Sequence, residues 1–282
     1  MILNAGNILL IGSILLFVSI VVGKAGFRFG VPALLLFLGV GMLFGTDGLG
    51  IEFNNPQTAQ FIGVIALSII LFSGGMDTSA AEIKPVLGQG IVLATVGVML
   101  TALLTGYFIY YITNLGNSFI TLNFTESLLL ASVMSSTDSA SVFSILRSKR
   151  QGLKENLRPM LELESGSNDP MAYMLTLLLI AYIQSGGMNI WEAGLSLVIQ
   201  LSVGAIAGFL LGRLAVLIIN KIDIDNESLY PILLLATAFF TFAATTLCKG
   251  NGYLAVYIAG LVVGNAKIVH KKSMGTFFDG FA

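Results

Sequence analysis

Two aspartates stand inside apolar segments of this chain, where only hydrocarbon side chains are expected. Asp169 lies in the run 161–183, and Asp138 interrupts the run 125–146 within a short stretch of serine and threonine. A charged group near the centre of a bilayer costs about 2.5 to 3.5 kcal/mol on insertion scales, so an intramembrane acid indicates a functional site. Two such acids on consecutive segments predict a site for a cation or a proton.

The first of these segments has the pattern of a broken membrane helix. It is apolar up to Met134, small and polar from Ser135 to Ser141, and apolar again from Val142. A break near the midplane frees backbone carbonyls and exposes half-helix ends, which is tolerated where the break lines a cavity. The hydroxyl of Thr137 and the carboxylate of Asp138 add the oxygen ligands that hard cations prefer.

The second segment carries a polar strip at helical spacing. Ser165 and Asp169 are four residues apart and share one face, and Glu164 and Asn168 share the adjacent face. Pro170 has no N–H, so the carbonyl four residues before it loses its helical partner. A buried carboxylate can hold either a proton or a cation. If such a site opens alternately to the two sides of a membrane, the protein exchanges one ion for the other.

The elements that position these residues are predicted to be membrane helices. The chain is 56% hydrophobic and only 10% charged, with a mean hydropathy of +0.91, outside the range of soluble domains. A backbone in lipid must satisfy its own hydrogen bonds, so we predict an all-α integral membrane protein, a polytopic helical bundle. Apolar runs long enough to span a bilayer are predicted at 5–23, 31–45, 58–76, 86–113, 125–146, 159–184, 191–219, 229–248 and 253–266.

The rare residue types narrow the chemistry. The one cysteine, Cys248, permits no internal disulfide, and the one histidine, His270, lies in a basic run outside the predicted spans. A histidine metal cluster or proton relay is therefore not expected, and proton chemistry falls to carboxylates. The net charge of -1 gives no indication of a nucleic-acid partner. No cofactor is predicted beyond the transported ions.

The basic residues predict the orientation. Every Lys and Arg except Lys249 falls at an odd-numbered connection between the predicted spans. Cytoplasmic loops hold the excess of Lys and Arg, so the N-terminus is expected outside and the loop 147–158 in the cytoplasm.

Two further patterns concern packing. Glu162 follows Arg158 by four residues, which favours an ion pair at a helix end over a role in transport. Gly204, Gly208 and Gly212 share one face of the seventh predicted span and allow close approach of another helix. That helix belongs either to the same chain or to a second copy, and the intramolecular interpretation is favoured.

At these residues the chain resembles the NhaP-type branch of the cation:proton antiporters, bacterial exchangers of Na⁺ or K⁺ for protons. The resemblance rests on Thr137-Asp138, on Glu164-Ser165 and Asn168-Asp169, and on the basic loop between the two segments. It implies two inverted repeats in a multi-pass bacterial inner-membrane protein with its N-terminus outside. It also implies a homodimer surrounded by membrane lipid.

The resemblance assigns roles to individual residues. Asp169 would be the exchanged carboxylate, and Thr137, Asp138 and Ser165 would complete the site for a monovalent K⁺ or Na⁺. In this family an asparagine directly before the key aspartate is associated with electroneutral exchange, so Asn168 implies exchange without net charge movement. Glu164 would pair with an arginine of a later helix. The supporting positions are Asn168, Glu164, Ser136 and Ser73, the last standing where many members carry a glutamate.

The stretches 71–77 and 136–158 resemble potassium/proton members linked to cell-volume regulation, so K⁺ is favoured over Na⁺. Such members often carry a C-terminal regulatory domain. Family members have more spans than this chain. We therefore expect residues 1–282 to form one transmembrane antiporter domain that contains the first repeat and the start of the second. This domain is not expected to transport ions without the later spans.

Two other function classes also place carboxylates in membrane helices. A proton- or sodium-coupled symporter of an organic substrate would also use membrane carboxylates, and it would need a roomy cavity with an anchoring Arg or Lys. An intramembrane aspartyl protease would show Gly-x-Gly-Asp, whereas this chain reads Ser167-Asn168-Asp169. A transporter rather than an enzyme is predicted, with symport as the alternative to antiport.

Overall fold

The computed structural model describes residues 5–29, 33–46, 48–116, 120–137, 153, 156–187 and 189–281. The described residues form helices, turns and connections, and none of them lies in a strand. The prediction of an all-α protein is confirmed. The chain divides into two compact parts, Met1–Ile62 and Gly63–Ala282.

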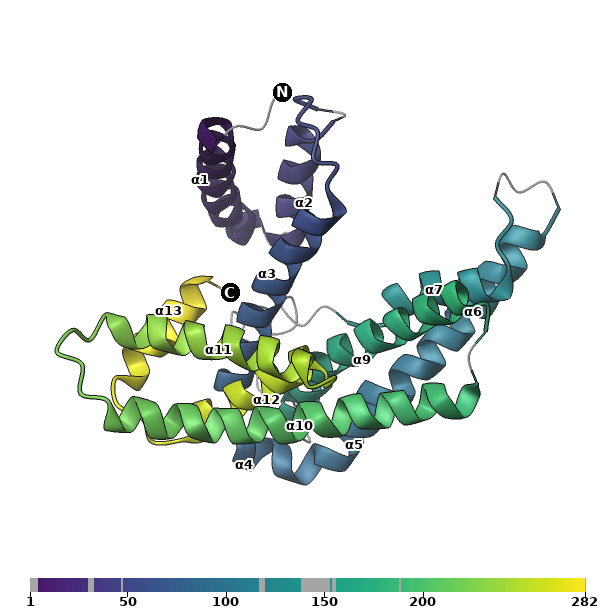
Figure 1. Ribbon diagram of the computed structural model, residues 1–282. Helices are drawn as coiled ribbons and strands as arrows, with labels where there is room; N and C mark the ends of the chain where they lie inside the picture. Colours follow the sequence, from purple (N-terminus) through teal and green to yellow (C-terminus); the bar gives the residue numbers. More distant parts are fainter. Residues whose placement is uncertain are drawn as a thin grey trace. The chain divides into compact units, whose positions relative to one another are not determined.

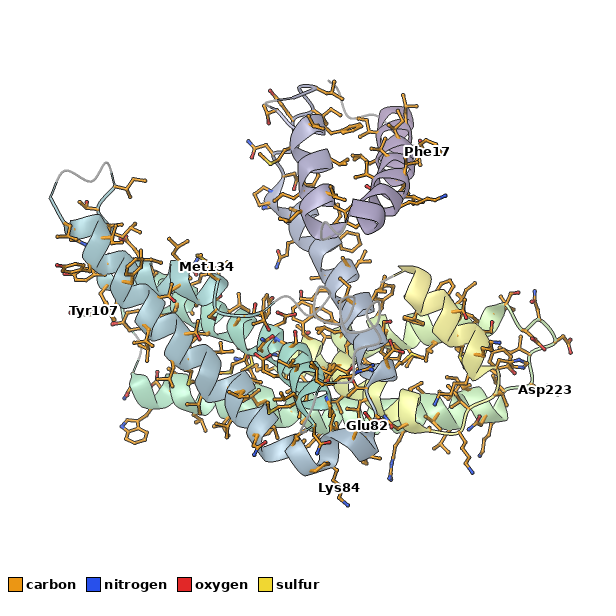
Figure 2. The ribbon with its side chains drawn as sticks, turned by 180° about the vertical axis from the view of Figure 1, so that it is seen from behind. Phe17, Glu82, Lys84, Tyr107, Met134 and Asp223 are labelled. Carbon is orange, nitrogen blue, oxygen red and sulfur yellow. The ribbon has the colours of Figure 1, made fainter. Side chains whose placement is uncertain are left out.

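The first part is a pair of apolar helices, α1 (Ala5–Phe29) and α2 (Ala33–Phe44), which lie side by side (Figure 1). Large apolar side chains such as Phe17 point outward from this pair (Figure 2). A helix that is apolar on all sides is typical of a membrane span. α3 (Pro56–Asp77) then leads into the second part.

A long helical stretch, Ala80–Asn114, follows α3, and its α-helical winding is interrupted twice. Pro85 lies in the 3-10 turn, where its missing N–H costs no α-helical bond. The pieces are α4 (Ala80–Ile83), the 3-10 turn η1 (Lys84–Val86), α5 (Leu87–Val92), the π-helical stretch η2 (Leu93–Gly97) and α6 (Val98–Asn114). The predicted span 86–113 began later because α4 and η1 carry Glu82 and Lys84.

α7 (Phe124–Val133) is shorter than the predicted segment and has a well-defined start. Asn123 accepts a hydrogen bond from the amide of Glu126 at 2.9 Å, and the Glu126 carboxylate accepts one from the amide of Asn123 at 2.8 Å. This reciprocal capping box satisfies two backbone donors that a helix start leaves open. α7 packs against both α6 and α9.

Five further helices lie in the described residues of the second part, and α12 packs against both α10 and α11 (Figure 1). Gly204, Gly208 and Gly212 of α10 meet α12 closely, at Asn251, Ala255 and Ala259 respectively. The intramolecular interpretation of the glycine row is thus the one the structure supports. The five helices are α9 (Leu157–Ser185), α10 (Ile190–Lys221), α11 (Leu229–Leu247), α12 (Gly252–Asn265) and α13 (Lys271–Phe281).

The sequence analysis did not predict α13 as a separate element. Its residues Met274 and Phe278 are buried while Lys271 and Lys272 are exposed, so only one face is apolar and no long apolar run results. The ring of Phe278 lies 5.3 Å from the ring of Phe72 on α3. α13 therefore closes the core that α3, α11 and α12 build.

Four helical segments of the described chain are long and apolar enough to cross a membrane: Pro56–Asp77, Ala80–Asn114, Trp191–Lys221 and Leu229–Leu247. Shorter apolar helices cover Leu9–Lys24, Leu35–Phe44, Phe124–Val133 and Gly252–Asn265. α9 has 29 residues but carries several charged side chains, so its composition is not that of a simple span. The count of nine spans stays a prediction.

Candidate functional site

The candidate site begins where α7 ends. The helix stops at Val133, and Ser135 to Thr137 continue in non-helical backbone, at the position where the sequence turns small and polar. The hydroxyls of Ser132 and Thr176 lie 3.0 Å apart and join α7 to α9. The second half of the predicted broken helix, with Asp138, lies outside the described residues.

Thr137 and three residues of α9 form a polar cluster. The amide nitrogen of Asn168 donates to Thr137 Oγ1 at 2.5 Å and to Glu164 Oε1 at 2.9 Å. Thr137 Oγ1 also lies 3.4 Å from Ser165 Oγ and 3.5 Å from Glu164 Oε2. Residues more than 25 positions apart in the sequence thus share one hydrogen-bonded group, which we call the Thr137 cluster.

Asn168 is the centre of the Thr137 cluster. Its side chain is only 1% exposed, and both hydrogen bonds described above come from its amide nitrogen. Its side-chain oxygen, Oδ1, is buried without a hydrogen-bond partner among the described residues. Because buried polar atoms are normally satisfied, this oxygen offers an acceptor to a water or an ion. The resemblance gave Asn168 a supporting role, which stays a prediction.

Asp169 follows Asn168 directly and is half-buried on α9. The helix continues through Pro170, whose carbonyl accepts a hydrogen bond from the side chain of Asn251 at 3.0 Å. The backbone next to Asp169 is therefore tied to the start of α12.

Sequence reasoning missed Asn251. Its side-chain oxygen caps α12 by accepting from the backbone amide of Leu254 at 2.9 Å, and its backbone amide donates to the carbonyl of Gln200 at 3.0 Å. Asn251 is buried, and its contacts with Pro170 and Gln200 join the start of α12 to α9 and α10. An asparagine just before an apolar run is a known N-cap signal, which could have identified it.

Replacing Asn251 by alanine is expected to lower the stability of the full-length protein by roughly 2 to 3 kcal/mol. The change removes the cap of α12 and leaves the buried Pro170 carbonyl without its donor. Thermal unfolding in detergent measures the loss. Asn251→Asp is the matched variant, since it keeps the oxygen that caps α12 and loses the amide that donates to Pro170. An unchanged melting temperature in both variants would contradict the stabilising role of Asn251.

The other predicted site residues lie as follows. Ser136 is half-buried in the connection after α7. Ser73 is buried on α3, and the hydrogen bonds of the Thr137 cluster do not include it. Glu164 was expected to pair with an arginine of a later helix, and in the described part of the chain it accepts from Asn168 and Thr137.

The structure contains the predicted ion pair between Arg158 and Glu162. Arg158 Nε donates to Glu162 Oε1 at 2.9 Å at the start of α9. The hydrogen bond and the charge of Glu162 raise the pKa of the Arg158 guanidinium above its ordinary value. Glu162 therefore has a structural partner at the helix end.

Arg158→Ala is expected to lower stability by about 1 to 2 kcal/mol, because the buried Glu162 loses its charged donor. The loss should shrink when Glu162→Gln is added, since the double variant leaves no unpaired charge. A double-mutant cycle of melting temperatures tests this, and strictly additive effects would show that the pair contributes nothing.

In the described ranges, no three His, Cys, Asp or Glu side chains gather as a group able to hold a metal ion. The oxygen atoms that the Thr137 cluster offers to a cation belong to hydroxyl groups, one amide and one carboxylate. A set with so few charges suits a monovalent cation better than a tightly held multivalent metal.

Known proteins that are similar to this chain are ion exchangers. The chain matches the family described as sodium/hydrogen exchanger, transmembrane, over residues 12–282. It is 40% identical over 277 residues to the K(+)/H(+) antiporter NhaP of Alkalimonas amylolytica and 35% identical over 280 residues to the K(+)/H(+) antiporter NhaP2 of Shewanella sp. strain ANA-3. Each match covers 98% of this chain and 47% of the relative, so the chain spans about half their length.

A solved structure shares the fold. The sodium proton antiporter MjNhaP1 of Methanocaldococcus jannaschii, in its structure at pH 8, superposes with a TM-score of 0.77 at 22% identity. The match covers 95% of this chain and 65% of that one. The family is one of multi-pass membrane transporters rather than of enzymes. The all-helical fold, the match over residues 12–282 and the close relatives together show that this chain belongs to the transmembrane sodium/hydrogen exchanger family.

Proposed function

We propose that this chain forms the ion site of an electroneutral K⁺/H⁺ exchanger in which Asp169 binds the cation and the proton in turn. The observation that carries the proposal is the Thr137 cluster. In this cluster Thr137, just beyond the end of α7, contacts Asn168 and Ser165 of α9. Ser165 shares a helix face with Asp169. Thr137, Ser165 and Asp138 would complete the coordination, with Asn168 and Glu164 holding the two helices together.

The exchange follows from competition at one carboxylate. A proton and a cation cannot occupy Asp169 together, because protonation removes the charge that attracts the cation. If the half-buried site opens alternately to the two sides of the membrane, each passage carries one ion in one direction and the other ion back. One charge then moves each way, so the exchange is electroneutral.

The choice of K⁺ over Na⁺ rests on the relatives and on the few charges at the site. The relatives at 40% and 35% identity are named as K(+)/H(+) antiporters. Ser73 stands where a more acidic site would place a glutamate. The proposal includes a homodimer in the bacterial inner membrane, with the N-terminus outside and a C-terminal regulatory domain that responds to cell volume.

The test uses the full-length protein in liposomes that contain a pH dye, with K⁺ or Na⁺ added outside. We expect a dye response at a lower concentration of K⁺ than of Na⁺. A membrane-potential dye in a parallel sample should stay unchanged because exchange moves no net charge. A response to neither ion would contradict antiport and favour symport of an organic substrate, and a potential change would contradict electroneutrality.

The proposed orientation makes a prediction for Cys248. This exposed cysteine ends α11 at an even-numbered connection, next to Lys249, which would face outward. A maleimide that cannot cross membranes should therefore label it in cells whose outer membrane has been made permeable. Cys248→Ser is the control for specificity, and labelling that requires lysis would reverse the orientation.

A further inference from the structure

Arg213 is a charged residue on an otherwise apolar and exposed face of α10. The charge pattern assigned Arg213 to the connection after the seventh predicted span, but in the structure it lies inside the candidate span Trp191–Lys221, about two turns or roughly 12 Å before Lys221. Its side chain is exposed, and its α10 neighbours Leu210 and Leu217 are 58% and 57% exposed. Such a face suits lipid, so a guanidinium within it needs an explanation.

Arg213 has an aromatic contact but no acidic partner within the described part of the chain. Its guanidinium carbon lies 4.5 Å from the centre of the Phe209 ring, one helical turn away. The guanidinium carries five N–H donors in one plane. These donors match the paired oxygens of a phosphate.

A cavity of about 510 Å³ lies beside Arg213, between α10 and the end of α12. Its walls include Phe209, Val216, Leu217 and Val262, so they are mostly apolar. Asn265 also lines it, but its oxygen accepts from the amide of Ala80 and its nitrogen donates to the carbonyls of Thr78 and Leu261. Arg213 is therefore the hydrogen-bond donor that this groove offers to a ligand.

Further positive charge lies at the end of the groove. Asn220 donates to the carbonyl of Lys267 at 2.9 Å, which holds the connection after α12 against the last turn of α10. Lys221 and Lys267 are both exposed there. The acidic residues Asp223 and Asp225 follow in the loop beyond α10 and are also exposed, and Figure 2 shows Asp223. Basic pockets between transmembrane helices near the membrane surface bind anionic headgroups.

We propose that the groove between α10 and α12 binds an anionic phospholipid, with the lipid phosphate on Arg213 and an acyl chain along Val216 and Val262. The two lysines favour an anionic headgroup over one that carries its own positive charge. The apolar walls match the acyl chain, as the guanidinium matches the phosphate. Lipid binding at this site does not depend on which ion is exchanged. A failure of the lipid proposal would therefore leave the proposed function unaffected.

The test measures lipid retention by native mass spectrometry of the full-length protein incubated with phosphatidylglycerol or phosphatidylcholine. Arg213→Ala is expected to weaken phosphatidylglycerol binding about tenfold, the effect of one lost charge-assisted contact. Arg213→Lys should weaken it less, since it keeps the charge and loses the two-pronged geometry. Lys24→Ala removes an exposed positive charge from α1 and should bind like the wild type.

Thermal stability gives a second reading. Phosphatidylglycerol should raise the melting temperature of the wild type and of Lys24→Ala, and should leave that of Arg213→Ala unchanged. Equal retention by Arg213→Ala, or equal binding of phosphatidylcholine, would overturn the proposal. The proposal would also be overturned if the melting temperature of Arg213→Ala lay below that of the wild type by the same amount with and without lipid. That result would mean that Arg213 pairs with an acid elsewhere in the protein.

Discussion

Asp169→Asn is expected to abolish cation-dependent proton movement in liposomes that contain the full-length protein. The substitution keeps the size of the side chain and removes both the negative charge and the proton that the proposed exchange requires. Removing one member of a buried charge pair costs about 2 kcal/mol or more, so cation affinity should fall roughly 30-fold at least. The pH-dye response to K⁺ measures the change directly.

Asp223→Asn is the matched control for this variant. Asp223 lies exposed in the connection after α10 (Figure 2), so the same chemical change there should leave the exchange rate unaltered. Size-exclusion profiles of both variants check that they fold. Exchange at the wild-type rate by Asp169→Asn would remove Asp169 from the carrier role and, with it, the proposed mechanism.

The second large effect concerns the packing of α3 against α12. A methyl group added to Gly75 would overlap the carbonyl oxygen of Tyr257 and lie 2.9 Å from the amide nitrogen of Leu261. Both are backbone atoms, so neither can turn aside as a flexible side chain would. Gly75→Ala is therefore expected to lower stability by about 3 kcal/mol or more, and to reduce the amount of folded protein in the membrane.

Gly63 of the same helix provides the comparison. A methyl group there meets no atom within 4 Å, so Gly63→Ala should be neutral or stabilising by up to about 1 kcal/mol through helix propensity. Melting temperature and membrane expression of the two variants test the difference. Similar values for both would show that α3 and α12 do not pack as closely as the structure has them.

Much of the candidate site could be predicted from the sequence because its signals are local. Ser165 and Asp169 share a helix face through their spacing alone, and the polar stretch after Met134 coincides with the end of α7. The Arg158–Glu162 pair follows from the same four-residue spacing. The partners of Asn168 and the contact of Asn251 with Pro170 join segments far apart in the chain, so no local pattern could identify these contacts.

The sequence by itself determined that this is a helical membrane protein with acids inside its apolar segments, since hydropathy and helical periodicity depend only on nearby residues. It left open whether the glycine row of α10 meets its own chain or a second copy, and it missed α13. Only the tertiary structure placed α12 against that row and Phe278 against Phe72. Such contacts depend on the shapes of surfaces from distant segments, which one-dimensional patterns do not contain.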